Sequence, residues 1–430
     1  MVSNASVDAI ARAGSQLQEV PALSTHKTRQ YAREDYAVEK MQIATRTPVS
    51  GTHGLRFAGS RWSGSPGWLC SLVAACAVCT CIAQAGADTG NLAAPVSNSN
   101  PQQKSVPDEV ARPGLRTDVV FDQYSAFSSA AELQRRVLSP LQARLVDKEL
   151  AKSEHALSQQ SIDLAKETFT VYVPATRPAQ GYAVLVFLFP WNHADLPARW
   201  SEALDRHGMI FVAPARAGND ESVLDRREPL ALLAAHNILR RYPVDPERVY
   251  IGGLSGGSRV SLRLALAYPD LFRGALLNAG SGAFGNAKIR LPPADLMRRF
   301  QEGSRVVFIT GENDKTQLDG DVLGRQSMQN WCAFDYMTVT VPSLEHDVLP
   351  APAFNQGLDA LEARNTPSSD KIVSCRARYE QELDGKLRQA EALRSGGRVD
   401  AATRVLDEID VRFGGLAAPR SVELARRIGR

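Results

Sequence analysis

A short stretch near the middle of the chain has the residue types and the spacing of an activated serine. It is Gly253-Leu254-Ser255-Gly256-Gly257, a G-x-S-x-G pattern. A serine hydroxyl in this setting can attack an acyl carbon. The pattern needs small residues at both ends, because the turn brings the strand and the helix close together, and glycine tolerates the strained backbone that lifts the hydroxyl above a sheet. We therefore predict Ser255 as a nucleophile and Gly253 and Gly257 as the glycines that form its turn.

The residues on either side of this motif supply the elements that such a turn joins. Arg248–Gly252 (RVYIG) is typical of a short buried strand, and Ser258–Tyr268 (SRVSLRLALAY) is typical of an amphipathic helix. The helix N-terminus would direct free N–H groups and a partial positive charge at the place where an oxyanion forms. Because a bare pattern also occurs by chance, its position between a strand and a helix gives it weight.

Strands and helices alternate on both sides of the motif. The other predicted strands are Thr168–Val173, Ala183–Phe189, Met209–Ala213, Gly274–Asn278, Arg305–Thr310 and Met337–Val341. The other predicted helices are Ala198–His207, Pro229–Tyr242 and Ala353–Ala363. Ala183–Phe189 (AVLVFLF) is apolar throughout, as expected of a parallel strand covered on both faces. The alternation predicts an α/β fold with a doubly wound, mostly parallel sheet and a ligand site at the carboxyl ends of its strands.

The stretch around the motif, YPVDPERVYIGGLSGGSRVSLRLALAYPDLFRGALLNAGS, resembles one branch of the α/β-hydrolases. This is the secreted esterase and depolymerase branch, with polyhydroxybutyrate depolymerase-like and feruloyl-esterase-like members. The likeness covers about Thr168–Ala363. It implies that carboxylic esters are hydrolysed through an acyl-enzyme by a Ser-Asp-His triad, without a metal or a cofactor.

The general base is expected after the serine, because the chain order in this fold is serine, acid, histidine. Of the seven histidines, only His346 follows Ser255. It lies on the loop Pro342–Pro350, directly after the last predicted strand, where the histidine of the family is found. We therefore predict His346 as the group that takes the proton of the serine.

The acid of the triad is expected in the loop after the strand that ends at Thr310. Asp314 lies three residues after a glycine in that loop, the usual place in this fold, and would accept the Nδ1 hydrogen of the histidine. Glu312 is the alternative acid. Asp319 and Asp321, further along, are predicted to be solvated loop charges.

An oxyanion hole requires two N–H donors. The first is expected to be the N–H of Gly256, which follows the nucleophile, and the second comes from the loop after Ala183–Phe189. Many relatives have His-Gly in that loop, whereas this chain has Pro190-Trp191, and proline has no N–H to donate. Trp191 is therefore the predicted second donor, and its indole is expected to cover the acyl pocket.

Composition and charge narrow the class of partner. The chain has 430 residues, of which 44% are hydrophobic and 23% charged, as in ordinary globular proteins. The net charge is only +3, and no basic tract is interleaved with aromatic residues. These features argue against nucleic acid as a partner. A small, uncharged or amphipathic substrate is a better fit than a polyanion, and the resemblance implies a small-molecule or polymeric ester.

Residues 1–87 are predicted to be a signal or targeting region. Trp68–Ala83 is an apolar run of 16 residues, preceded by Arg61 and followed by Ala83-Gln84-Ala85. A basic flank, a short apolar core and a small-x-small end are typical of a secretory signal, and the run is short for a membrane span. The long segment in front suggests that the true start lies downstream of Met1.

The signal implies a periplasmic or secreted protein with no stable membrane span after processing. Val73-Ala74-Ala75-Cys76 loosely resembles a lipoprotein box, and a signal-anchor or a buried helix is a further alternative for this run. Residues 88–113, rich in Pro, Ser, Asn and Gln, are predicted to be a disordered linker.

The two cysteines beyond the apolar run are Cys332 and Cys375. If the protein is exported, this pair lies in an oxidising compartment and a disulfide between the two is favoured. On the chain-entropy account, such a loop would stabilise the fold by about 3–4 kcal/mol. Two independent buried thiols are the alternative.

Helical segments flank the predicted hydrolase domain, residues 114–370. Ser125–Leu150 shows a helical pattern with Leu133, Val137, Leu141 and Leu145 at a spacing of four, which predicts an N-terminal helix. Residues 371–430 are predicted to form a helical hairpin that turns at Gly396-Gly397. The stretch RSGGRVDAATRVLDEID resembles half of a tetratricopeptide unit, but only one unit is visible. We therefore predict an accessory hairpin docked on the catalytic domain, with a surface for a protein partner as the alternative.

Together these patterns predict an exported serine hydrolase that cleaves carboxylic esters. A serine peptidase of the same fold and a binding protein that kept the fold without turnover are the alternatives. The two enzymes require Ser255 to react with a fluorophosphonate probe, and the binding protein does not.

Overall fold

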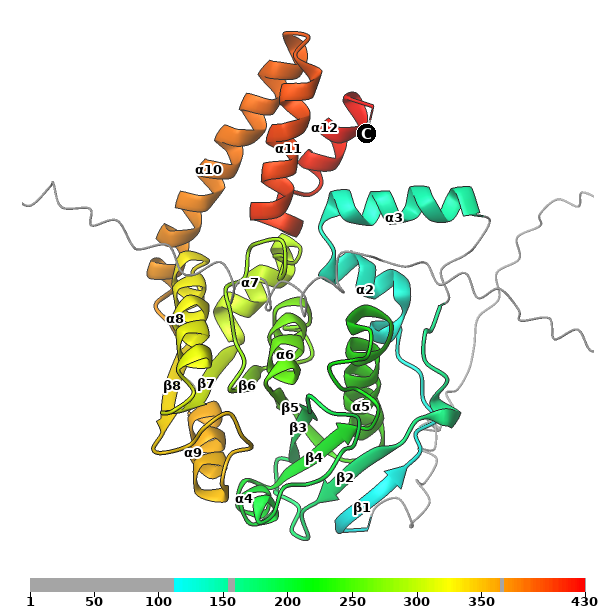
Figure 1. Ribbon diagram of the computed structural model, residues 1–430, viewed down its shortest axis with the longest axis vertical. Coiled ribbons are helices and arrows are strands. Elements are labelled where there is room, and N and C mark those ends of the chain that lie inside the picture. Colours follow the sequence, from blue (N-terminus) through cyan, green and yellow to red (C-terminus); the bar gives the residue numbers. More distant parts are fainter. Residues whose placement is uncertain (1–111, 154–158, 364–366, 430) are drawn as a thin grey trace, which may run out of the picture. The chain divides into compact units, whose positions relative to one another are not determined.

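The structure, a computed structural model, describes residues 112–153, 159–363 and 367–429 (Figure 1). The predicted signal or targeting region (1–87) and nearly all of the predicted linker (88–113) lie outside the described residues. No helix within the described ranges is long and apolar enough to cross a bilayer.

A single eight-stranded sheet forms the centre of the fold, with the strand order β1-β2-β4-β3-β5-β6-β7-β8. Neighbours from β4 to β8 are parallel, whereas β1 and β2 are antiparallel to their neighbours. The doubly wound, mostly parallel sheet predicted from the sequence is confirmed. The strands are β1 (Gly114–Val119), β2 (Phe169–Val173), β3 (Tyr182–Leu188), β4 (Met209–Pro214), β5 (Val244–Leu254), β6 (Gly274–Asn278), β7 (Arg305–Gly311) and β8 (Tyr336–Val341).

Helices cover both faces of the sheet (Figure 1). Side chains of β3 alternate between two cores, because successive residues of a strand point to opposite faces. Val184, Val186 and Leu188 join the core beneath α5 and α6, whereas Leu185 and Phe187 join the core beneath α4 and α9. The helices around the sheet are α4 (Trp200–His207), α5 (Glu228–Arg241), α6 (Gly256–Ala267), α7 (Ala294–Gly303), α8 (Lys315–Asn330) and α9 (Ala351–Glu362).

The N-terminal helix is broken, which corrects the prediction of one helix over Ser125–Leu150. It is divided into α2 (Ala130–Val137) and α3 (Pro140–Ser153). Pro140 supplies no N–H for a continuing helix and pushes the residue before it toward an extended backbone, so the chain turns here. Leu145, predicted to face the core, is 52% exposed.

The C-terminal region contains the predicted hairpin and one helix more. The hairpin consists of α10 (Ser369–Ser395) and α11 (Val399–Phe413), and α12 (Arg420–Arg427) follows it. Buried side chains of α10 and α11 belong to the same core as α5 and α6. On α11, Asp410 accepts hydrogen bonds from Ser139 Oγ and, at 3.1 Å, from the N–H of Leu141, which attaches this helix to the start of α3.

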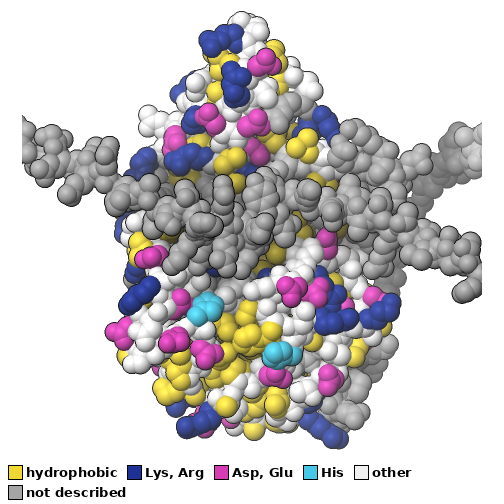
Figure 2. Space-filling model, in the orientation of Figure 1, with side chains coloured by type: hydrophobic (Ala, Val, Ile, Leu, Met, Phe, Trp, Pro, Cys, Tyr) yellow, Lys and Arg dark blue, Asp and Glu magenta, His cyan; other side chains and the backbone are white. Residues whose placement is uncertain are grey.

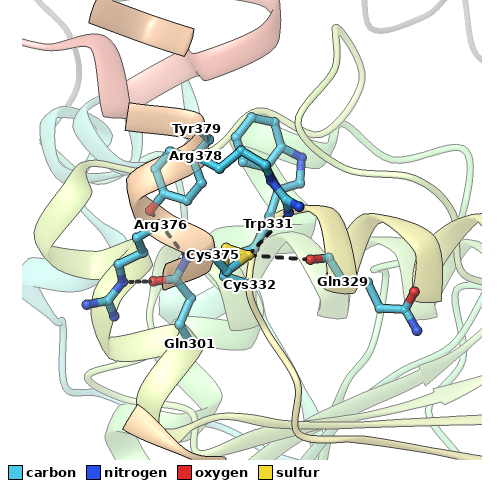
Figure 3. The surroundings of a disulfide bond; sticks show 8 residues. All are labelled: Gln301, Gln329, Trp331, Cys332, Cys375, Arg376, Arg378 and Tyr379. Atoms are coloured by element: carbon cyan, nitrogen blue, oxygen red, sulfur yellow. Dashed lines mark hydrogen bonds between the residues drawn. A yellow bond between two sulfur atoms is a disulfide. The ribbon is translucent and has the colours of Figure 1, made fainter. Parts of the chain in front are cut away.

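A disulfide between Cys332 and Cys375 connects α10 to the segment after α8 (Figure 3). The two Cα atoms are 5.7 Å apart. Next to it, Gln301 Nε2 donates to the carbonyl oxygen of Trp331 at 2.7 Å, and Arg376 Nε donates to Gln301 Oε1 at 2.6 Å. The predicted bridge is therefore present, within a set of contacts that holds the C-terminal helices against α7 and α8.

Candidate active site

The G-x-S-x-G motif forms the tight turn between β5 and α6. Ser255 has φ 55° and ψ −118°, a conformation that residues with a side chain rarely adopt. Its N–H donates to the carbonyl oxygen of Asn278 at 2.9 Å, so the end of β6 supports the turn. The serine lies at the carboxyl end of a central strand, where the sequence predicted a site.

Close packing explains the glycines of the turn. A Cβ on Gly253 would lie 2.5 Å from the carbonyl carbon of Gly257. A Cβ on Gly257 would overlap the carbonyl oxygen of Leu188 and lie 2.7 Å from its carbon. Because these atoms are backbone, they cannot move aside cheaply. A third glycine, missed in the sequence, is Gly280 after β6, whose Cβ would lie 2.7 Å from the Cα of Ser255.

The structure brings Ser255, His346 and Asp314 into one line of hydrogen bonds. His346 Nε2 lies 2.9 Å from Ser255 Oγ, and His346 Nδ1 lies 2.6 Å from Asp314 Oδ2. The Asp314 side chain is 8% exposed and the His346 side chain 44% exposed. The line therefore runs from a buried carboxylate, through an imidazole, to a hydroxyl that solvent and substrate can reach. This is the order of groups that a general base needs to activate a serine.

The alternative acid, Glu312, has a different position. Its Oε2 accepts the N–H of Ser343 at 3.1 Å, and Ser343 has φ 59°. Asn313 adds two contacts to the same loop: its Nδ2 donates to the carbonyl oxygen of Ser343 at 3.3 Å, and its N–H donates to that of Leu344 at 3.0 Å. Glu312 and Asn313 thus hold the loop that carries His346.

Asp321 corrects the prediction of a solvated loop charge. It lies on α8, is 1% exposed, and accepts hydrogen bonds from Ser281 Oγ and, at 2.7 Å, from Thr310 Oγ1. Burial raises the pKa of Asp321, and the carboxylate of Asp314 adds to this rise, while the two hydroxyls and Arg325 oppose it. The carboxyl group joins the loop after β6, beneath the serine, to the end of β7, which leads to Asp314. Asp319 is exposed, as predicted, but it lies on α8 and not in a loop.

Helix α8 was not predicted, because its hydrophobic pattern is inverted. Its buried positions include Gln317, Asp321, Gly324 and Ser327, which are polar or small. Val322 and Leu323 are instead 41% and 51% exposed. Periodicity of apolar residues cannot find a helix whose inner face is polar. Two features of the sequence could have indicated the helix: Asp314 is a good N-cap residue, and the small and polar residues that are buried recur every three or four positions.

The predicted oxyanion donors lie at the start of α6 and on the loop after β3. Gly256 is the first residue of α6, where an N–H has no acceptor within the helix. Trp191 is stacked between Phe189 and His193, with ring centroids 5.3 Å and 5.2 Å apart. Its indole Nε1 is buried and has no hydrogen-bond partner among the described residues. The indole is thus packed into a stack of three rings.

The strand order and the strand-turn-helix around the serine give the chain the α/β-hydrolase fold. Residues 217–322, from the loop before α5 into the first half of α8, match the family described as Esterase PHB depolymerase. The resemblance expected from the sequence is confirmed for this stretch. Over this stretch the chain is similar to esterase and depolymerase hydrolases.

A curated protein of known activity is similar to part of the chain. A poly(3-hydroxybutyrate) depolymerase of Ralstonia pickettii is 28% identical over 95 residues, which is 19% of this chain. The match spans only 20% of the length of that protein.

Among solved structures, an S-formylglutathione hydrolase from Agrobacterium tumefaciens is similar over 45% of this chain and 88% of its own, with 17% identity and a TM-score of 0.36. A poly(3-hydroxybutyrate) depolymerase from Bordetella parapertussis is similar over 49% and 88%, with 16% identity and a TM-score of 0.34. Because these scores are low, the fold assignment rests on the strand order and the turn.

Proposed function

We propose that this chain is a serine hydrolase that cleaves carboxylic esters through an acyl-enzyme. Ser255 is the nucleophile, His346 the general base and Asp314 the group that orients the imidazole. The observation that carries the proposal is the unbroken line of hydrogen bonds from Asp314 through His346 to Ser255, at 2.6 Å and 2.9 Å. These distances are within the range in which a base can take the proton of a nucleophile.

In the first half of the reaction, Ser255 Oγ adds to the ester carbonyl carbon while its proton passes to His346 Nε2. The imidazolium that forms is stabilised by the Asp314 carboxylate at Nδ1. The carbonyl oxygen becomes an oxyanion, and the N–H groups of Gly256 and Trp191 are proposed to donate to it. When the tetrahedral intermediate collapses, His346 gives the proton to the departing alcohol. Water then repeats these steps on the acyl-enzyme and releases the acid.

The surface around the serine supports an ester with apolar parts. Partly buried hydrophobic residues of two loops pack on the core beneath α4 and α9. They are Leu344 and Val348 on the loop of His346, and Trp191 and Leu196 on the loop after β3. On the face drawn in Figure 2, hydrophobic side chains gather in a patch beside histidine side chains. A small-molecule ester or a polymeric ester can contact such a patch without a deep pocket.

We also propose that the protein works outside the cytoplasm. The disulfide between Cys332 and Cys375 supports this proposal, because such bonds persist mainly in oxidising compartments. The signal sequence predicted upstream of the described residues agrees with it.

A panel of p-nitrophenyl esters with rising acyl length, run beside Ser255→Ala, tests the proposed reaction. We expect turnover by the wild type and a fall in kcat of roughly 10⁴–10⁶-fold in the variant. A fluorophosphonate should label Ser255 in the wild type, with the modified peptide identified by mass spectrometry. Equal rates for wild type and variant would refute the esterase, and faster cleavage of aminoacyl amides than of esters would indicate a peptidase.

A further inference from the structure

Asn219 lies against the residue that follows the nucleophile. A Cβ built on Gly256 would overlap Asn219 Oδ1, and it would lie 2.8 Å from Cγ and 3.1 Å from Nδ2. The carboxamide of Asn219 therefore fills the space that a side chain at position 256 would take. A side chain at position 256 would therefore have to displace the amide of Asn219.

The backbone of Asn219 is attached to the other half of the proposed oxyanion hole. Its N–H donates to the carbonyl oxygen of Pro190 at 2.8 Å, next to Trp191 in the chain. The preceding residue, Gly218, packs so closely that a Cβ there would lie 2.7 Å from the carbonyl carbon of Trp191. A turn closed by the N–H of Glu221 and the carbonyl oxygen of Gly218 at 3.1 Å holds Asn219 in place. The side chain thus lies against Gly256, and the backbone of the same residue is bonded to the residue before Trp191.

The other asparagines around the site use their amides to hold the fold. Asn192 Oδ1 accepts the N–H of Gly218 at 2.8 Å, Asn278 Nδ2 donates to Asp347, and Asn313 Nδ2 donates to Ser343. Within the described residues, the Asn219 carboxamide makes no hydrogen bond, and the residue is exposed. Neither end of the amide is fixed, so a half-turn about Cβ–Cγ presents Nδ2 where Oδ1 now lies.

We propose that Asn219 Nδ2 is a side-chain donor of the oxyanion hole and supplements the N–H groups of Gly256 and Trp191. This inference rests on the proposed ester hydrolysis. As Ser255 Oγ bonds to the carbonyl carbon and its proton moves to His346, the C=O π electrons move onto the oxygen. That oxygen gains its charge beside Gly256, where Asn219 donates a hydrogen bond. In a chain with Pro190-Trp191 in place of His-Gly, a neutral amide strengthens the site without placing a charge near the imidazole.

Three substitutions separate hydrogen-bond donation from space filling. Asn219→Ala removes the amide, Asn219→Leu keeps most of its volume, and Asn219→Asp keeps its shape but replaces the donor by a carboxylate. We expect each to lower kcat on a p-nitrophenyl ester by roughly 10²-fold, since removing one oxyanion donor has an effect of this order, with KM nearly unchanged. Asp220→Ala, at the neighbouring exposed position, is the matched control and should keep the wild-type kcat.

The affinity for an inhibitor that mimics the tetrahedral intermediate distinguishes hydrogen-bond donation by Asn219 from a purely structural role. A trifluoromethyl ketone forms a tetrahedral adduct with the serine, so its Ki should rise in Asn219→Ala by the same factor as kcat/KM falls. The thermal unfolding temperature should stay at the wild-type value. If Asn219→Leu keeps the wild-type kcat, Asn219 only fills space and the inference is overturned.

A double-mutant cycle tests the contact itself. Gly256→Ala alone should lower kcat because its methyl group displaces the amide. Added to Asn219→Ala, the same methyl group should lower kcat much less, because the space is already free. Strict additivity would contradict the contact. A wild type without turnover and without labelling of Ser255 would refute the proposed function and this inference with it, whereas an active wild type with an unaffected Asn219→Ala refutes the inference alone.

Discussion

The nucleophile and the general base are held in place by different means. Ser255 is fixed by backbone packing: Gly253, Gly257 and Gly280 bring main-chain atoms so close that no side chain fits. His346 lies on a loop whose position is set by hydrogen bonds with Glu312 and Asn313. The first arrangement is steric, and the second depends on hydrogen bonds that are partly exposed to solvent.

The difference has a consequence for each half of the site. A contact between backbone atoms cannot adjust by a change of rotamer, so a small error at the turn must move a strand or a helix. A hydrogen bond to a loop contributes only about 1 kcal/mol net, so its loss shifts the loop and leaves the fold intact. We therefore expect substitutions at the turn to affect folding and activity together, and substitutions at the loop to affect activity alone.

The largest effect is expected from Gly257→Ala. Its methyl group would overlap the carbonyl oxygen of Leu188 in β3, so we expect activity to fall to background and the free energy of unfolding to drop by more than about 2 kcal/mol. Ester turnover and urea denaturation measure the two effects. Gly282→Ala is the control, because a Cβ at Gly282 meets no atom within 4 Å. A stable, active Gly257→Ala would show that the turn is not sterically fixed.

An intermediate effect is expected from Glu312→Ala. The variant loses the acceptor for the N–H of Ser343, so the loop shifts and kcat/KM should fall by roughly 10–100-fold, in line with the sensitivity of catalysis to small displacements. The unfolding temperature should be nearly unchanged. Glu312→Gln, which keeps an acceptor oxygen, should recover most of the activity.

Glu345→Ala is the matched control for that experiment, because Glu345 is an exposed carboxylate on the same loop as His346. A parallel loss of activity in Glu345→Ala would assign the effect to charge near the imidazole and contradict the role given to Glu312.

The smallest effect is expected from Asp321→Asn, at the carboxyl group that joins the two halves. Burial raises the pKa of Asp321 above its ordinary value of 3.8, so the folded state holds this proton more tightly than the unfolded state does. The protonated Asp321 carboxyl group therefore stabilises the fold. This contribution to the free energy of unfolding is present in full below about pH 3.8 and is lost as the pH rises through the folded-state pKa. Asparagine does not ionise and avoids this loss.

Urea denaturation of both proteins between pH 3 and pH 8 measures that difference. The stability of the wild type relative to Asp321→Asn should decline as the pH rises. Asp319→Asn, on the exposed side of the same helix, is the control. A difference between wild type and Asp321→Asn that stays constant over the range would show that the buried carboxyl does not titrate differently on folding.

Local patterns were sufficient for the elements that carry the site. The central strand and helix around Ser255 were found because a continuous apolar run and a period of 3.6 are visible over a few residues. β6, Gly274–Asn278, was predicted with the observed bounds, and the other parallel strands to within one residue or a few. The exposure of Leu145 was not predicted, because it depends on which distant segments pack against its helix. The helix break at Pro140 was also missed, although the proline itself is present in the sequence.

The sequence by itself determined that Ser255 lies on a strand-turn-helix, because the glycines, the apolar strand and the amphipathic helix all act within about twenty residues of it. Chain order then predicted His346 as the base, and the position of Asp314 three residues after a glycine predicted it as the acid. Only the tertiary structure decided that Glu312 holds the histidine loop, that Asp321 is buried, and that Asn219 lies against Gly256. The physical reason is that a polar side chain takes its role from the partners that the fold brings to it, and hydrophobic periodicity carries no information about those partners.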